Sequence, residues 1–282
     1  MSSAIIFPKD FKASNVSISP VKVMDSGAKQ AYANYNGSSM TMQVSSLSIP
    51  YGLSVFDKAG PIKYSVDLSL KGYEGDVPKA KQVYDAFHSL DEHMMDLGVK
   101  FSKQWFKSEL SRDIIKAFYT PCVRFSKDAD GNLKPYPPTL KLQLKQRDGK
   151  FETKLFVLDD ENKPVLTDSP IEDILVKGAI VSSLIQCTGV WFAGSKFGLS
   201  WKAIQIKADH LPESIRGFAF RDEDAPVVKA PVNKFELDDE SEAEVEVAPP
   251  TMDDDADLVE PVAVPKKPVT MTKKKIVAAV KK

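Results

Sequence analysis

Rings and cations are interleaved in three stretches of the chain, at residues 102–107, 118–125 and 191–202. Flat rings stack on unpaired bases while Lys and Arg side chains follow the phosphates, so this mixture suits single-stranded nucleic acid. The third stretch is the strongest candidate, because its glycines and cations predict a loop that reaches solvent between two strands. We expect its rings to be exposed and to stack on bases: Trp191, Phe192 and Phe197, with Trp201 either beside them or in the core.

Basic side chains before that loop are expected to hold the phosphates. Lys141, Lys145 and Arg147 lie on the polar side of a stretch in which leucines alternate with polar residues, the pattern of a half-buried strand. That polar side is either the wall of a binding groove or an ordinary solvated surface. The complete predicted nucleic-acid site consists of Tyr119, Arg124, Lys141, Lys145, Arg147, Trp191, Phe192, Lys196, Phe197, Trp201 and Lys202.

The usual motifs of catalysis and metal binding do not occur in the sequence. It contains none of GxxxxGK[ST], GxGxxG, GxSxG or HExxH. The three histidines show no metal-ligand spacing, and Cys122 and Cys187 are expected to be reduced and buried. We therefore expect no enzyme, no cofactor and no metal site. The reduced cysteines fit an intracellular protein, and no apolar run reaches the length of a membrane helix, so we also expect no membrane partner.

Hydrophobic periodicity predicts short strands with one long helix among them. Residues 62–70 alternate and predict a strand, and an apolar stripe over 83–105 predicts a helix that Asp76 caps. The Asp148-Gly149 turn predicts a hairpin between 140–144 and 151–158, and 178–190 pairs with 199–206. These elements predict an α+β fold that is mainly β, a β-barrel with an inserted helix.

Charge is divided between the body of the chain and its end. Residues 236–260 carry twelve acids and no Lys or Arg, whereas residues 266–282 carry seven lysines and no acid. The acidic segment is expected to be disordered and to compete with nucleic acid for the cationic groove. Three roles are open for the lysine-rich end, namely further DNA contacts, neutralisation of the acids, or nuclear import, and the alternative to all three is a solvated disordered end. The expected divisions are an irregular arm (1–34), a binding domain (35–220), an acidic tail (221–265) and a lysine-rich end (266–282).

Four stretches carry a family resemblance: SLSIPYGLSVFD (46–57), SKQWFK (102–107), YTPCVRFSKD followed by YPPTLKLQL (119–144), and GVWFAGSKFGLSWKAIQIK (189–207). They resemble the single-stranded DNA-binding proteins of nucleocytoplasmic large DNA viruses, which are similar in turn to replication proteins of short-tailed phages. The resemblance implies an OB-fold barrel, cooperative coating of single strands and an acidic C-terminal tail. It also implies that Trp191, Lys196, Trp201, Lys202 and Gln205 lie at or near the DNA face. The lysine-rich end departs from the phage pattern, in which the tail finishes in acids and an aromatic residue.

The function expected from these features is non-enzymatic coating of single-stranded DNA without sequence specificity, in viral replication, recombination or repair. Expected partners are single-stranded DNA, replication proteins such as a polymerase or helicase-primase on the acidic tail, and further copies in a homodimer or cooperative oligomer. The expected setting is a viral replication site in the host nucleus or cytoplasm, or the virion. Two alternatives are open: a structural or virion-packaged assembly protein, and an RNA-binding module.

Overall fold

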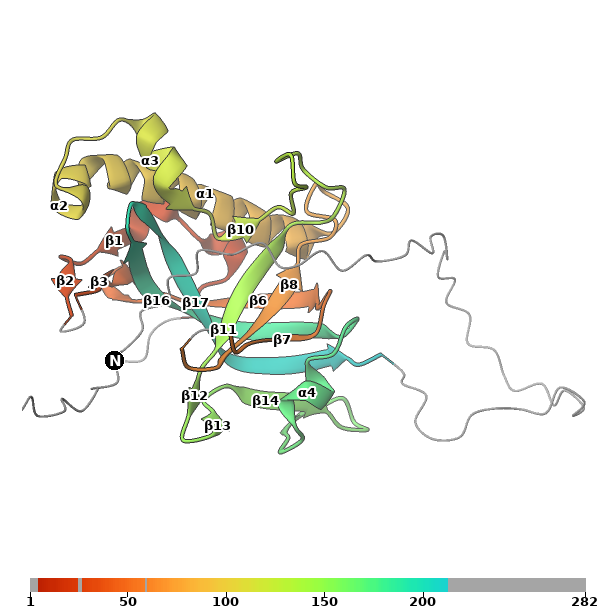
Figure 1. Cartoon of the computed structure of the whole chain (residues 1–282). Helices are drawn as coiled ribbons and strands as arrows, with labels where there is room; N and C mark the ends of the chain where they lie inside the picture. The colour runs from red at the N-terminus through yellow and green to blue at the C-terminus, as the bar shows by residue number, and fades with distance from the viewer. Residues whose placement is uncertain (1–4, 25–26, 59, 213–282) are drawn as a thin grey trace, which may run out of the picture.

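The computed structural model describes residues 5–24, 27–58 and 60–212, which form strands with few helices (Figure 1). The helices are α1 (Pro78–Lys100), α2 (Ser102–Phe106), α3 (Arg112–Phe118) and α4 (Ile171–Ile174), and two 3₁₀ turns span Pro8–Asp10 and Ala13–Asn15. The strands of the first half are β1 (Val16–Ile18), β2 (Lys22–Val23), β3 (Lys29–Ala31), β4 (Ala33–Tyr35), β5 (Ser38–Ser39), β6 (Thr41–Ser48), β7 (Leu53–Phe56) and β8 (Lys63–Ser69). Those of the second half are β9 (Tyr119–Thr120), β10 (Val123–Arg124), β11 (Thr139–Leu144), β12 (Gln146–Arg147), β13 (Lys150–Phe151), β14 (Lys154–Leu158), β15 (Pro164–Leu166), β16 (Ile180–Ala193) and β17 (Lys196–His210). The acidic and lysine-rich segments lie outside the described residues.

Five strands pair in a cycle that returns to its first member. β6 pairs with β8, β8 with β11, β11 with β17, β17 with β16, and β16 with β6. The β11–β17 pair is parallel and the other four pairs are antiparallel. The predicted α+β class, mainly β with a helix inserted between strands, is confirmed.

The alternating sequence of β11 explains how the sheet buries its core. Leu140, Leu142 and Leu144 are buried, whereas the residues between them are partly exposed. Leu142 lies opposite Val66 of β8, which is also fully buried. Side chains opposite one another in a sheet share a face, so one face of β8 and β11 is apolar and the other is polar.

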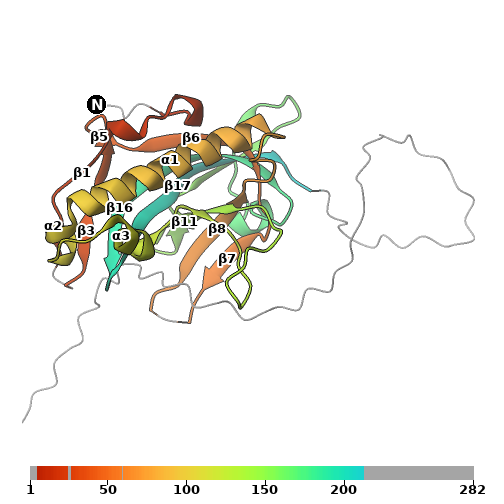
Figure 2. The ribbon, with the colours of Figure 1, turned by 90° about the horizontal axis from the view of Figure 1, so that it is seen from above.

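Helix α1 packs along one side of the strands, as the views from the side and from above both show (Figures 1 and 2). Its buried side chains form the predicted stripe, which includes Val83, Phe87, Leu90 and Met94. The helix ends at Lys100 and a separate short helix, α2, carries Trp105. Asp76 does not cap it, because the N-cap position is Val77 and no side chain bonds there.

Two segments differ from the expected secondary structure. The arm at 1–34, expected to be irregular, contains β1–β4 in its described part, and β3 pairs with β16. The turn at Asp148 closes only the two-residue hairpin β12–β13, and β14 pairs with β17 instead of β11. β11 has no edge left for β14, because β8 occupies one edge and β10 and β17 occupy the other. The domain boundaries themselves stay a prediction.

Candidate nucleic-acid interface

A row of polar residues crosses five adjacent strands in direct register. Ser54 of β7 lies opposite Ser65 of β8, which lies opposite Gln143 of β11. Gln143 lies opposite Lys202 of β17, and Lys202 lies opposite Gln186 of β16. Register partners point to the same side of a sheet. The row therefore marks a continuous polar surface on the side away from the buried leucines.

Residues two positions along each strand belong to the same surface, because side chains alternate between faces. Phe56 lies opposite Lys63 on one side of the row, and Lys141 lies opposite Asp67 on the other. We call this surface the outer polar face. It is formed by Ser54, Phe56, Lys63, Ser65, Asp67, Lys141, Gln143, Lys145, Gln186, Trp191, Ser200 and Lys202.

Trp191 reaches this face through a packing arrangement that needs glycine. It lies opposite Gly198 of β17, which is two residues before Ser200. A Cβ atom on Gly198 would lie 2.9 Å from Cζ2 of the Trp191 ring and 2.9 Å from the Thr120 carbonyl oxygen. The indole therefore lies against the Gly198 backbone. Gly189, at φ +132°, lets β16 pass close to the carbonyl group of Ala31 in β3.

A cavity of about 180 Å³ opens beside Trp191. Its walls come from β3, β11, β16 and β17, and its lining residues are Gln30, Gln143, Lys145, Thr188, Gly189, Val190, Trp191 and Ser200. Two of the predicted residues, Trp191 and Lys145, thus line the same cavity. Gln30 lies directly opposite Trp191 in the β3–β16 pair.

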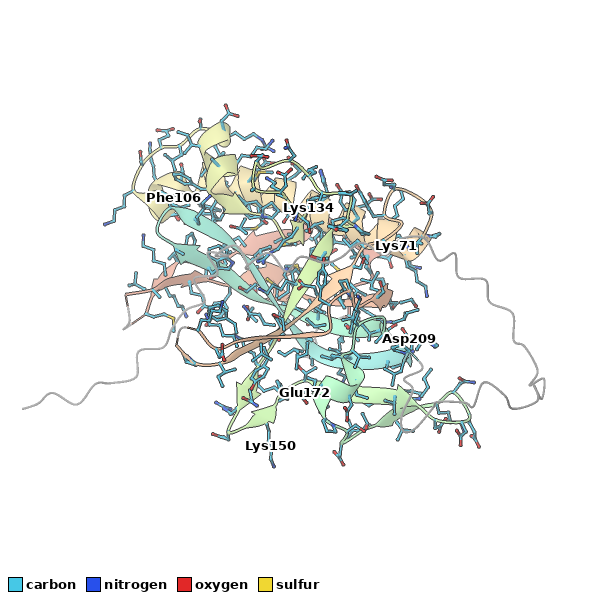
Figure 3. All side chains as sticks on the ribbon, turned by 45° about the vertical axis from the view of Figure 1, so that its right-hand side comes forward. Lys71, Phe106, Lys134, Lys150, Glu172 and Asp209 are labelled. Atoms are coloured by element: carbon cyan, nitrogen blue, oxygen red, sulfur yellow. The ribbon has the colours of Figure 1, made fainter. Side chains whose placement is uncertain are left out.

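The remaining predicted cations lie around this surface, several with partners of their own. Lys202 Nζ is 3.7 Å from a carboxylate oxygen of Glu152, a pair that is partly exposed. Lys196 donates to the carbonyl oxygen of Ala117 at 2.9 Å, in the last turn of α3. Arg124 lies in β10 opposite Thr139, and Arg147 is exposed in the β12–β13 hairpin. In Figure 3 that hairpin projects away from the strands at Lys150.

The expectation that Phe192 and Phe197 are exposed loop rings is wrong. Residues 191–193 continue β16, residues 196–198 begin β17, and a tight turn with Gly194 at φ +55° joins them. Phe197 is fully buried and Phe192 is 9% exposed. Both rings pack edge-on against Trp105, with centroids 5.5 and 5.4 Å away. Phe106, labelled in Figure 3, completes this aromatic cluster.

Trp201 and Tyr119 are also core residues, and Trp191 is 8% exposed, less than expected. The Trp201 ring meets Phe87 of α1 at 5.0 Å. The Tyr119 hydroxyl donates to Asp91 of α1 at 2.6 Å, and the Cys122 N–H donates to both oxygens of the same carboxylate at 3.1 Å. Burial raises the pKa of Asp91 and raises that of Tyr119 well above its usual value. These groups join α1 to the sheet and do not lie on the outer polar face.

Sequence reasoning missed most residues of the outer polar face and also Gln30 in the cavity, and four of these residues show why. Phe56, 45% exposed on β7, is a ring that reaches solvent. Gln143 sits between Lys141 and Lys145 in the same alternation, so that pattern contained its signal. Gln30 and Ser200 carry no local signal, because only strand pairing brings them to Trp191. Both cysteines are free and buried, as expected, and burial raises the pKa of Cys187 to about 12.

Across residues 5–24, 27–58 and 60–212, no three His, Cys, Asp or Glu side chains gather in a way that could hold a metal ion. In the same part of the chain, no helix has both the length and the apolar character needed to cross a membrane.

Comparison with solved structures finds distant similarity to phage proteins. A single-stranded DNA-binding protein of bacteriophage Enc34, solved in complex with single-stranded DNA, is 13% identical with a TM-score of 0.38, over 71% of this chain and 96% of that one. The single-stranded DNA-binding protein gp2.5 of bacteriophage T7 is 12% identical with a TM-score of 0.36, over 64% and 98%. Scores below 0.5 do not establish a shared fold, so the proposal below rests on this chain's own residues.

The sequence comparisons assign a family without a function. No curated protein matches the chain. The expected kinship with proteins of large DNA viruses therefore stays a prediction. Residues 67–222 match DUF5871, described as a family of unknown function. That segment is more than half of the 282 residues, and the chain belongs to this family.

Proposed function

We propose that the protein binds single-stranded DNA on the outer polar face and catalyses no reaction. The observation that carries this proposal is the register-aligned row from Ser54 to Gln186. Lysines and two rings lie beside it on the same face. Unpaired DNA offers phosphates for the cations and bare bases for the rings, whereas duplex DNA hides its bases within the stack.

Each group on the face has a role in this proposal. Lys141, Lys145 and Lys202 hold phosphates, with Arg147 and Arg124 at the two ends of β11. Phe56 and Trp191 offer rings to bases. Lys202 contacts Glu152 at 3.7 Å, so a phosphate must displace an exposed carboxylate. Exposed ion pairs contribute only about 0.2–1 kcal/mol, which a phosphate contact can replace.

The cyclic strand pairing supports an OB-fold-like barrel as the scaffold. In such five-stranded Greek-key barrels, the face of the second and third strands binds oligonucleotides, together with the loops after the first and fourth strands. In this chain the corresponding strands are β8 and β11. The loop after the first strand carries β7 with Phe56, and the loop after the fourth is the turn at Gly194. The outer polar face occupies the equivalent position.

We extend the proposal to the end of the chain. The twelve acids of residues 236–260 compete with DNA for the outer polar face and offer a docking segment to replication proteins. Coating of DNA during viral replication, recombination or repair, in host nucleus or cytoplasm, is the setting that the sequence resemblance implies. Binding through phosphates and stacked rings is sequence-tolerant.

The test is titration of the full chain with single-stranded and duplex oligomers of equal length at low salt. We expect preference for the single strand and a loss of about 0.7 log units of affinity per log unit of salt for each phosphate held. The variant Lys145→Ala should weaken binding and reduce that slope, and Phe56→Ala should remove a stacking contact of about 1–3 kcal/mol. Lys81→Ala is the control, because Lys81 pairs with Asp85 on α1. Equal affinity for single and double strands would disprove the proposal.

A second candidate function, assembly with other copies as a structural component, is favoured by one observation. Tyr51, Val55, Phe56 and Ile62 expose 45–64% of their surface around β7, which among the described residues pairs only with β8. An exposed apolar edge strand can pair with another chain. Light scattering without DNA distinguishes the two functions. A fixed oligomer that does not bind oligonucleotides would support assembly. Parallel titration with RNA oligomers tests the RNA-binding alternative.

A further inference from the structure

The cavity beside Trp191 differs from the rest of the outer polar face, because it is hollow rather than flat. Its volume is about 180 Å³, and its walls come from four strands that are far apart in the sequence. For comparison, a cavity of roughly 150 Å³ in another protein takes up a benzene molecule. The hollow beside Trp191 is therefore large enough for one six-membered aromatic ring.

Among the described residues, Trp191, the aromatic wall of the cavity, has no partner ring. Trp191 is 8% exposed, yet no ring contact is made to it in the described part of the chain, whereas Trp105 and Trp201 both pack against phenylalanines. A largely buried indole at a cavity offers stacking area to a ligand, and an indole N–H is a hydrogen-bond donor.

The polar groups at the cavity suit a heterocycle better than a hydrocarbon. Neither the Gln30 amide nor the Ser200 hydroxyl has a partner in residues 5–24, 27–58 and 60–212. An amide supplies donors and an acceptor on one side chain, and a hydroxyl supplies either. The Thr188 hydroxyl is already committed to the Ser200 carbonyl oxygen at 3.2 Å. Lys145 is exposed at the rim, where a phosphate attached to the ring's sugar would lie.

We propose that this cavity holds one pyrimidine base of the bound strand, turned out of the line of stacked bases. The inference rests on the proposed function and adds a base preference to it. Trp191 forms the wall, Gln30 and Ser200 hydrogen-bond the base edge, and Lys145 holds the adjoining phosphate. Enzymes that take up an extruded base read it in the same way, by its hydrogen-bonding edge and by flanking side chains. A purine is larger by a fused five-membered ring and fits less well.

The experiment compares oligo-dT, oligo-dC and oligo-dA of one length, with Trp191→Phe used to assign the fluorescence change. Wild-type protein should bind the two pyrimidine oligomers more tightly than oligo-dA. Each hydrogen bond lost from the base edge changes affinity about two- to tenfold. Gln30→Ala should therefore lower affinity for oligo-dT or oligo-dC more than for oligo-dA. Ser200→Leu, which fills the cavity, should bring the three affinities together.

Lys145→Ala is the matched comparison, because loss of a phosphate contact should weaken binding of all three oligomers equally and leave the ratio of their affinities unchanged. Thermal melts of each variant confirm folding. The inference would be overturned if wild-type protein bound the three oligomers equally, or if Gln30→Ala and Ser200→Leu both left the ratio of pyrimidine to oligo-dA affinity unchanged. Either result leaves the preference for single over double strands intact. If no oligomer binds, the proposed function fails first. Titration with thymidine monophosphate then tests the cavity by itself. A change in Trp191 fluorescence that disappears in Ser200→Leu would support base binding in the cavity, and the absence of any change would refute it.

Discussion

At the scale of single residues, small side chains decide where the large ones can lie. Gly198 gives Trp191 a flat backbone to lie on, because any Cβ there would meet the indole at 2.9 Å. Gly98 likewise leaves room for neighbouring side chains at α1, where a Cβ atom would lie 2.8 Å from the Ile115 side chain and 3.0 Å from the Phe197 ring. The helix can therefore approach the turn between β16 and β17 closely. Glycine in these places supports packing rather than flexibility.

We expect loss of the Asp91 side chain to lower the free energy of unfolding strongly. Its carboxylate accepts bonds from the Tyr119 hydroxyl and the Cys122 N–H in the interior. Asp91→Ala leaves both donors unsatisfied, at about 1–3 kcal/mol each in free energy of unfolding. The control is Asp96→Ala, because its ion pair with Arg112 is exposed and contributes at most about 1 kcal/mol. Urea denaturation that finds equal losses would contradict the structural role of Asp91.

The same carboxyl group gives a pH dependence with a definite sign. Burial raises the pKa of Asp91 in the folded protein, although its hydrogen bonds act in the opposite direction. The unfolded chain loses this proton near pH 3.9 and the folded chain loses it higher. Stability should therefore fall as pH rises from about 4 towards the folded pKa, and this contribution should be constant above it. Asp91→Asn should flatten the dependence in denaturation curves over that range, and an unchanged slope would refute it.

At the scale of elements, the long ribbon of β16 and β17 serves two purposes on its two sides. One side carries Phe192 and Phe197 into the cluster around Trp105, and the other side carries Trp191, Ser200 and Lys202 to the outer polar face. Trp105 of α2 therefore packs on the side of the ribbon opposite the outer polar face. Lys196, bonded to the Ala117 carbonyl oxygen, fixes the turn to α3.

This arrangement predicts an indirect effect on binding. Trp105→Ala should lower the free energy of unfolding by about 3–5 kcal/mol, as large aromatic truncations in cores do. It should also weaken DNA binding, because the ribbon loses its support. Phe56→Ala should show the reverse pattern, with a stability change below about 1 kcal/mol and a clear loss of affinity. Chemical denaturation and DNA titration of both variants check the contrast. A stable Trp105→Ala protein would contradict it.

At the scale of the whole molecule, the charge of the chain is close to zero but unevenly placed. The net charge is -1, although residues 236–260 alone carry twelve acids. The rest of the chain is therefore cationic overall. Because the anionic segment is tethered to the cationic part of the chain, its effective concentration at that surface is high. Salt screens the electrostatic attraction between the two.

Truncation at Asn233 should therefore tighten DNA binding at low salt, with a gain that shrinks as salt is added. A chain that ends at Pro265 is the control, because it keeps the acids and loses only the lysine-rich end. It should bind no more tightly than the full chain. Fluorescence titration at two salt concentrations distinguishes these outcomes. Unchanged or weaker affinity after truncation at Asn233 would exclude competition by the acidic segment.

Local patterns in the sequence determined some of the elements. Alternation of leucine with polar residues placed β11, and the apolar stripe placed α1, because burial of one face requires those periods. The mixture of rings and cations also indicated nucleic acid. Only the tertiary structure decided which rings are exposed. Phe192 and Phe197 are buried because Trp105, more than eighty residues earlier, packs on them, and Gln30 reaches Trp191 because β3 pairs with β16. Contacts between distant segments depend on strand register and helix placement, which no local period contains.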